Sequence, residues 1–246
     1  MIVLFTDFGL EGPYTGQVKA VFCREAPSVP VIDLFADAPS RRPMEAAYLL
    51  AAYSGAFPTE TVFFCVVDPE VGGNRPAVAA RIDGRWFVGP GNGLFEPLLR
   101  RGETVETYVI VAGTGTISAS FHGRDLFAPV VARLARGLSP ESAGLVRAPI
   151  PRFDHWPDDL AAVVYVDIYG NLVTGLRADN LVGNVGLVIA GQRLERARTF
   201  SDVPVGTAFW YENANGLAEI AVNCGRADIM FHQDVGGAIQ IVTLAS

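Results

Sequence analysis

The chain has 246 residues, enough for one large domain or two smaller ones. Half of them are hydrophobic and only 18% are charged, so the chain can bury a large core, and we expect it to bury further surface by self-association. The net charge of −7, with 19 Lys and Arg scattered along the chain, argues against nucleic acid as a partner.

The first part of the chain alternates between two kinds of pattern. Continuous apolar runs at 2–6, 30–35 and 61–67 predict strands buried on both faces. Between them, 14–26 has apolar residues at helical spacing and 43–55 is rich in Ala and Leu, so both are predicted to be helices. This order predicts an α/β fold with a mostly parallel sheet flanked by helices.

The same pattern continues toward the middle of the chain. Further strands are predicted at 77–82, 86–89 and 105–112, and an amphipathic helix at 124–136. Together these elements define an N-terminal α/β domain over residues 1–145.

The composition of the chain changes after residue 145. Residues 146–160 contain several prolines and few apolar runs, which predicts a linker. Beyond it, residues 161–246 are predicted to form a smaller all-β barrel domain without helices. Its strands are expected at 162–167, 185–190, 208–211, 217–223 and 238–244.

Three cysteines at wide spacings and no C-x-x-C pair indicate a reducing compartment. The N-terminus has no basic leader, and Asp7 interrupts its apolar run, so it is interpreted as a strand rather than a signal peptide. The weakly polar stretch 46–57 is too short to span a membrane. We therefore expect a cytoplasmic protein with no membrane partner.

Polar residues stand beside Gly or Pro where strands end or a helix begins. They occur in 6–9 (TDFG), 68–73 (DPEVGG), 88–93 (VGPGNG) and 121–125 (FHGRD). Ligands of open α/β sheets bind outside the carboxyl ends of the strands, so this grouping predicts a ligand site. No G-x-G-x-x-G or Walker loop is present, which argues against a phosphate cradle.

Each of these polar residues has a structural and a functional interpretation. Asp7 either caps the following helix or accepts the two hydroxyls of a ribose. Asp68 and Arg75 either form a structural ion pair or belong to a site. His122 is either a surface histidine or a neutral imidazole at a helix N-terminus, which with a carboxylate and a guanidinium activates water.

The second domain contributes two segments with the composition of turns, 167–174 (DIYGNLVT) and 213–225 (NANGLAEIAVNCG). Each is either turn structure alone or part of a ligand site. No H-x-x-H or paired His–carboxylate spacing occurs, so we predict no metal site.

Six segments, taken in order, resemble one family. They are 6–9 (TDFG), 67–72 (VDPEVG), 89–93 (GPGNG), 121–125 (FHGRD), 166–171 (VDIYGN) and 219–223 (EIAVN). The sequence resembles the adenosine-forming S-adenosyl-methionine hydrolases, or SAM hydroxide adenosyltransferases, which are related to fluorinase and chlorinase. The resemblance spans nearly the whole chain. It implies an α/β domain followed by a β-barrel domain, and a homotrimer whose sites lie between neighbouring subunits.

The resemblance also implies residue roles. Asp68, Arg75 and His122 match the set that positions and activates water, and Asp7 matches the residue that holds the ribose hydroxyls. In the second domain, the matched contacts are the methionine amino group for Asp167, adenine for Asn171, and the adenine edge for the backbone of Val222 and Cys224. Ala214 and Asn215 stand where relatives often carry Ser or, in halogenases, Arg for the methionine carboxylate.

These roles imply hydrolysis of S-adenosyl-methionine as substrate, with no cofactor. The halogenases carry tyrosine where Asp68 stands, and a carboxylate there repels an incoming halide. A halide-dependent synthase is therefore the disfavoured alternative. A non-catalytic sensor of adenosine or S-adenosyl-methionine, and a structural trimer with internal ion pairs, are the other two.

Overall fold

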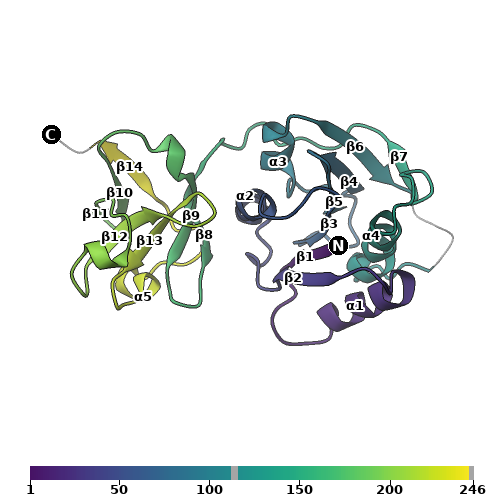
Figure 1. Cartoon of the computed structure of the whole chain (residues 1–246), viewed down its shortest axis with the longest axis horizontal. Helices are drawn as coiled ribbons and strands as arrows, with labels where there is room; N and C mark the ends of the chain where they lie inside the picture. The colour runs from purple at the N-terminus through teal and green to yellow at the C-terminus, as the bar shows by residue number, and fades with distance from the viewer. Residues whose placement is uncertain (112–115, 244–246) are drawn as a thin grey trace. The chain divides into compact units, whose positions relative to one another are not determined.

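The computed structural model describes residues 1–111 and 116–243 and divides into two compact units (Figure 1). The first contains Met1–Ala51 and Phe57–His155, and the second contains Ala52–Ala56 with the residues from Trp156 onward. The predicted strand ends at 112 and 244 lie outside the described residues. Each unit has a hydrophobic core of its own.

A seven-stranded sheet forms the centre of the N-terminal unit, in the order β2-β1-β3-β5-β4-β6-β7. Its parallel part consists of β1 (Ile2–Thr6), β2 (Val31–Phe35), β3 (Val62–Val66) and β5 (Arg85–Pro90). Every residue of β1 and β3 is buried, which explains their unbroken apolar runs. The predicted α/β fold is confirmed.

The other half of the sheet is antiparallel. It contains β4 (Ala77–Ile82), β6 (Val105–Ile110) and β7 (Leu145–Arg147). Only Asp83 and Gly84 connect β4 to β5, and so short a connection can join antiparallel strands but not parallel ones. Strand β7 occupies the beginning of the segment predicted as a linker.

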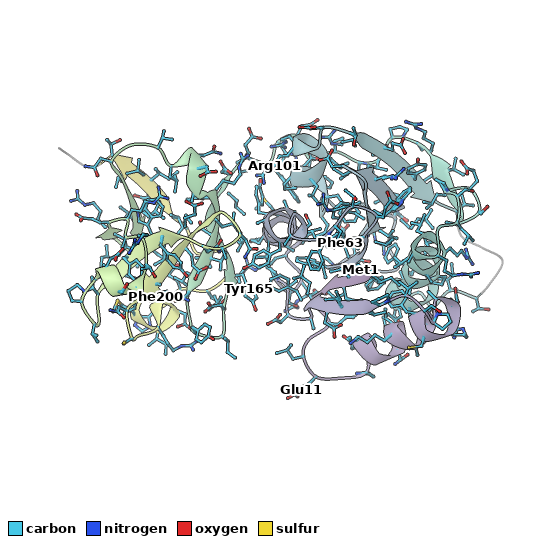
Figure 2. The ribbon with its side chains drawn as sticks, in the orientation of Figure 1. Met1, Glu11, Phe63, Arg101, Tyr165 and Phe200 are labelled. Carbon is cyan, nitrogen blue, oxygen red and sulfur yellow. The ribbon has the colours of Figure 1, made fainter. Side chains whose placement is uncertain are left out.

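Helices cover both faces of this sheet (Figure 1). On one face lie α1 (Tyr14–Glu25) and α4 (Ala128–Ala135), which share a core with alternate residues of the parallel strands. On the other lie α2 (Pro43–Ser54) and α3 (Glu96–Arg101), of which α3 was not predicted. Phe63 points into the interior of the unit, whereas Glu11 extends from a surface loop (Figure 2).

The C-terminal unit contains two antiparallel sheets, ordered β12-β13-β9-β8 and β11-β10-β14. The strands are β8 (Leu160–Val166), β9 (Leu172–Arg177), β10 (Val185–Ile189), β11 (Gln192–Leu194), β12 (Ala208–Glu212), β13 (Leu217–Val222) and β14 (Gln240–Thr243). Bridges between Ala162 and Ala238 and between Arg196 and Trp210 join the edges of the two sheets. The strands therefore close into the predicted barrel.

The prediction that this unit has no helix was wrong. Residues Ala227–Phe231 form the short helix α5, and Ala178–Asn180 and Phe200–Asp202 form single 3₁₀ turns. Each spans five residues or fewer, which is too short for a helical period to be recognised in the sequence. Strands β9 and β11 were also not predicted.

Replacing Phe22 tests the packing of α1 on the sheet. Its ring is fully buried and meets the ring of Phe64 edge to face, with centroids 5.8 Å apart. We expect Phe22→Ala to lower the free energy of unfolding by about 3–5 kcal/mol, measured by urea unfolding followed by circular dichroism. The half-exposed Val146 on β7 is the control, and Val146→Ala should cost less than about 1 kcal/mol. Equal losses in both variants would contradict this packing.

Candidate active site

Asp68, Arg75 and His122 form one hydrogen-bonded cluster just beyond the carboxyl end of β3. Arg75 Nε donates to Asp68 Oδ1 at 3.0 Å and to Oδ2 at 3.1 Å, and Arg75 Nη2 makes a further contact with Oδ2. The same Nη2 lies 2.9 Å from His122 Nδ1. Three residues spread over more than fifty positions are thus joined by one guanidinium.

This geometry determines the protonation of the imidazole. A guanidinium can only donate hydrogen bonds, so Nδ1 of His122 must be the acceptor. Burial and the positive charge of Arg75 lower the pKa of His122, while the negative charge of Asp68 partly opposes them. The imidazole is therefore neutral near pH 7, with its proton on Nε2.

The cluster is shielded from solvent and held in place by its surroundings. The side chains of Asp68 and Arg75 are 3% and 5% exposed, and the guanidinium lies 5.3 Å from the centroid of the Phe127 ring. Asn92, in the glycine-rich segment after β5, donates to the carbonyl of Val67 at 2.9 Å. That bond fixes the backbone immediately before Asp68, which assigns a positioning role to the 89–93 segment.

His122 stands at the start of an unusual helical segment. Residues Gly123–Phe127 form a π-helical turn that continues directly into α4, so the predicted helix 124–136 begins with a wider turn. Such turns are often found at functional sites. The loop before it is tied down because Asp125 accepts the N–H of Ser118 at 3.0 Å and pairs with Arg124.

Asp7 shares a cavity with this cluster. The cavity has a volume of about 220 Å³ and is lined by Asp7, Phe8, Tyr14, Val66, Asp68, Val71, Ser120, Phe121, His122 and Gly123. Asp7 does not cap α1; its Oδ2 instead accepts the N–H of Arg41 at 2.9 Å. Burial raises the pKa of Asp7, the Arg41 N–H opposes that rise, and the charge of Asp68 adds to it.

The aromatic walls of this cavity were missed by the sequence analysis. Phe121 lies edge-on to Phe8 and Tyr14, with ring centroids 5.9 Å and 5.4 Å away. Gly123 leaves room for them, because a Cβ at this position would lie 3.2 Å from Phe8 and 3.3 Å from Phe121. The walls therefore suit a flat or apolar ligand group beside the polar cluster.

Four of the predicted binding residues line one pocket of the C-terminal unit. Asp167, Asn171, Val222 and Cys224 surround a space of about 590 Å³, together with Tyr169, Phe200, Tyr211, Gly225 and Arg226. Oδ1 of Asp167 accepts the N–H groups of Tyr169 and Asn171, at 2.9 Å and 2.8 Å. The turn predicted at 167–171 therefore exists, and it also faces the pocket.

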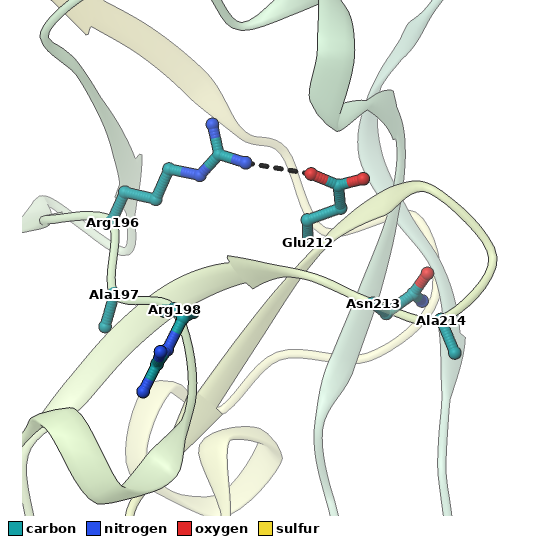
Figure 3. A pocket seen from close by; sticks show the side chains of 6 residues that line it. All are labelled: Arg196, Ala197, Arg198, Glu212, Asn213 and Ala214. Carbon is teal, nitrogen blue, oxygen red and sulfur yellow. Dashed lines mark hydrogen bonds and ion pairs between the residues drawn. The ribbon is translucent and has the colours of Figure 1, made fainter.

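Ala214 and Asn215 do not join that group. Ala214 lines a separate pocket of about 530 Å³ with Arg196, Ala197, Arg198, Glu212 and Asn213 (Figure 3). Across this pocket, Arg196 pairs with Glu212 at 2.9 Å. The N–H of Asn215 donates to Asn213 Oδ1 within the turn between β12 and β13. Neither residue is among those that line the pocket of Asn171.

Within residues 1–111 and 116–243, no group of three or more His, Cys, Asp or Glu side chains is placed to hold a metal ion. Over the same residues, no helix is both long enough and apolar enough to cross a membrane.

Family models match both units of the chain. A model described as the SAM hydroxide adenosyltransferase N-terminal domain matches residues 2–144, and one described as the C-terminal domain of the same family matches 161–240. The chain belongs to the SAM hydroxide adenosyltransferase family. The resemblance drawn from the six ordered segments is thus confirmed, and these segments lie within the regions that the two SAM hydroxide adenosyltransferase models match.

Individual members and relatives of the family agree with this assignment. The chain is 38% identical over 242 residues to the (R)-S-adenosyl-L-methionine hydrolase of Thermus thermophilus, covering 92% of this chain and 93% of the relative. A fluorinase of Nocardia brasiliensis is more distant, at 23% identity over 98% of this chain and 96% of its own. The crystal structure of an uncharacterized conserved protein from Thermotoga maritima matches with a TM-score of 0.88 at 31% identity, covering 98% and 99%.

The protonation state of His122 can be measured directly. We expect Arg75→Met to raise the pKa of His122, because it removes the neighbouring positive charge and leaves the negative charge of Asp68. The measurement is an NMR titration of the imidazole C–H resonances, assigned with His155→Gln and His232→Gln variants. The same titration curve in wild type and Arg75→Met would contradict the contact between Arg75 and His122.

Proposed function

We propose that this protein hydrolyses S-adenosyl-methionine to adenosine and methionine. The observation that carries the proposal is the buried Asp68–Arg75–His122 cluster, which places a carboxylate and a neutral imidazole on one cavity with Asp7. The relative from Thermus thermophilus, named (R)-S-adenosyl-L-methionine hydrolase, supports the same reaction.

The substrate needs little help from acid catalysis. Its sulfonium makes methionine a neutral leaving group, so the C5′–S bond breaks with both electrons passing to sulfur as a water oxygen bonds to C5′. The protein has to align that water with the C5′–S bond and to remove bulk water from the site. Methionine leaves as a thioether, and the new C5′–O bond yields adenosine after one proton is lost.

The cluster orients the water. Nε2–H of His122 donates to the water oxygen, since Nδ1 is already engaged by Arg75. Asp68 accepts a hydrogen from the same water, and Arg75 keeps that carboxylate ionised and fixed. The bound water becomes strongly acidic only as the C–O bond forms, so the weakly basic carboxylate of Asp68 is a sufficient proton acceptor.

Substrate binding is divided between the two pockets. Asp7 accepts the ribose hydroxyls in the first, where its Oδ1 is left after Oδ2 has bound Arg41. In the second, Asp167 contacts the methionine ammonium, and Asn171 with the backbone of Val222 and Cys224 contacts adenine. The halide-dependent alternative is disfavoured, because the buried carboxylate of Asp68 stands where an anion would have to bind.

The proposal extends to assembly and location. A homotrimer, in which neighbouring subunits complete each other's sites, accords with the apolar composition and with ligand-binding residues in both units. No cofactor is required by the reaction as written. A cytoplasmic location is supported by the cysteines, because Cys23, Cys65 and Cys224 are all free thiols.

Product analysis tests the reaction. The protein is incubated with S-adenosyl-methionine in oxygen-18 water, with and without chloride, and the products are identified by mass spectrometry. Adenosine carrying oxygen-18, together with methionine and independent of chloride, is the expected result. A chlorinated nucleoside would establish the halide reaction instead, and absence of product with tight adenosine binding would indicate a sensor.

Asp68 has a role in the chemical step rather than in binding. We expect Asp68→Asn to lower kcat by about 10²–10⁴-fold, because the amide no longer accepts the water proton, while KM changes only a few-fold. Steady-state kinetics of adenosine release gives both values. A loss confined to KM would contradict the assignment.

Replacing Asp7 should affect binding rather than the chemical step. We expect Asp7→Asn to weaken adenosine binding about tenfold or more in titration calorimetry, since the one amide oxygen is needed to accept the N–H of Arg41 and the side chain then presents a donor to the ribose hydroxyls. Because the folded-state pKa of Asp7 is raised, wild-type affinity should begin to fall at a higher pH than for an ordinary aspartate as the medium is acidified. The Asn variant should lack this pH dependence. Deoxyadenosine should bind more weakly than adenosine to the wild-type protein, and this difference should shrink in Asp7→Asn. The same ratio of the two affinities in both proteins would argue against the contact between Asp7 and the ribose hydroxyls.

A further inference from the structure

The segment 121–125 contains two residues that the proposed mechanism does not use. Arg124 and Asp125 come just after His122, and they pair with each other through two hydrogen bonds. Arg124 Nε donates to Asp125 Oδ1 at 2.6 Å, and Nη2 donates to Oδ2 at 2.9 Å. Neither residue is among those that line the cavity of Asp68 and His122. An effect of this pair on the reaction therefore has to pass through another side chain.

The guanidinium of Arg124 is fixed against the ring of Phe121. Its Cζ lies 5.2 Å from the centroid of that ring, within the range of a cation–π contact. Nη1 of Arg124 donates to Oε1 of Gln17 at 2.8 Å, and Gln17 belongs to α1. Because Nε, Nη1 and Nη2 are all engaged, the planar group is held by α1, by Asp125 and by the ring at once. Arg124 thus joins the aromatic wall of the cavity to α1.

Asp125 ties the backbone that carries Phe121 to the same group. Its Oδ2 accepts the N–H of Ser118 at 3.0 Å, and the N–H of Phe121 donates to the carbonyl of Ser118 at 3.3 Å. The N–H of Asp125 donates in turn to the carbonyl of Phe121 at 3.2 Å. The pair of Arg124 and Asp125 therefore holds both the ring and the backbone of Phe121.

Phe121 forms a wall of the cavity beside the reacting water. Its ring lines the same space as Asp68 and His122, and that space has a volume of about 220 Å³. Phe8, which lines it too, lies edge-on to Phe121 with the ring centroids 5.9 Å apart. In the proposed reaction Asp68 and His122 orient the water, so a shift of the Phe121 ring would change the room beside it. The size of the position left for the nucleophile depends on where this ring is held.

We propose that Arg124 and Asp125 are positioning residues that hold Phe121 against the nucleophile position, so that the cavity admits water and excludes larger neutral nucleophiles such as alcohols. This inference rests on the proposed function, in which water attacks C5′ of S-adenosyl-methionine. The side chain of Arg124 is 36% exposed, and ion pairs at such positions contribute little to stability. A role in placing Phe121 accounts for the fixation of the guanidinium on three sides.

Methanol is the probe, because it is water with one added methyl group. In the competing reaction the methanol oxygen bonds to C5′ as the C5′–S bond breaks, methionine leaves with both electrons on sulfur, and the methanol proton passes to Asp68. Mass spectrometry gives the ratio of 5′-O-methyladenosine to adenosine, which does not depend on the fraction of active protein. After correction for the two concentrations, we expect wild-type protein to prefer water by about tenfold or more. A ratio that follows the concentrations alone would overturn the proposal.

Arg124→Gln tests the guanidinium. The change removes the fork on Asp125 and the cation over Phe121, so we expect the corrected ratio of 5′-O-methyladenosine to adenosine to rise about two- to fivefold, the factor that an exposed cation–π contact implies. The matched control is Arg133→Gln on α4, where the arginine donates to the carbonyl of Ala143 at 3.4 Å and is not among the residues that line the cavity. The control should keep the wild-type ratio.

A double-mutant cycle tests whether Arg124 acts through Phe121. Phe121→Leu removes the ring and should raise the ratio by itself. In that background Arg124→Gln should have no further effect, because the side chain that it positions is gone. The same rise on Arg124→Gln with and without the Phe121 ring would overturn the proposal.

Two further outcomes separate the possible failures. If Arg124→Gln does not fold, Gln17→Leu removes only the bond between α1 and Arg124 and should raise the ratio by a smaller factor. An unchanged ratio in whichever of these variants is folded overturns the role of Arg124, even if S-adenosyl-methionine is hydrolysed normally. Wild-type protein that forms no adenosine from S-adenosyl-methionine overturns the proposed function as well.

Discussion

The guanidinium of Arg75 is shared between a carboxylate and an imidazole, and the chemistry of the cavity depends on that sharing. Nε and Nη2 of Arg75 engage both oxygens of Asp68, so the carboxylate cannot rotate, and the same Nη2 fixes the tautomer of His122. A lysine would supply the charge without this geometry. The side chain of Arg75 is therefore specified by its shape as well as by its charge, and the buried ring of Phe127 packs against its guanidinium.

The acidic residues of the cavity are brought together because they follow neighbouring parallel strands. Strands β1 and β3 lie side by side in register, so Asp7 and Asp68, which follow them, are placed at the same edge of the sheet. Asn92 supports the same edge from the segment after β5. The like charges of Asp7 and Asp68 on one cavity repel each other, which contributes to the raised pKa of Asp7. In the proposed reaction the sulfonium of the substrate would offset part of that repulsion.

The elements that could be predicted are those whose pattern is long and uniform. The runs of β1 and β3 are apolar throughout because both faces of these strands are covered, and α4 has a clear apolar side. Strand β9 was not recognised, because its buried residues include Thr174 and Gly175 and it follows directly on a turn. The antiparallel pairing of β4 with β5 does have a local signal, the two-residue turn Asp83–Gly84, whereas the pairing of β4 with β6 depends on residues farther along the chain.

The same distinction applies to the site. Asp68 and Arg75 could be selected because they follow a predicted strand, and His122 because it precedes a predicted helix; the structure joins all three. The direction of the hydrogen bond between Arg75 and His122 could not be foreseen, because it links residues 47 positions apart. Glu219, which is buried and accepts the hydroxyl of the pocket residue Tyr211, was passed over among apolar neighbours. A single acid inside a strand such as LAEIAV is nevertheless a usable signal, since burying it requires partners nearby.

The closed ring of strands in the C-terminal unit also bears on how copies of the protein can associate. One bridge at each seam places an edge strand of one sheet beside the chain of the other sheet, which leaves less room there for a strand from another chain to pair. In the N-terminal sheet the outer strands are β2 and β7. The first carries Asp33, paired with Lys19, and the second is three residues long. A charged side chain on β2 and the short length of β7 thus both disfavour the edge-to-edge strand pairing by which chains form open fibres.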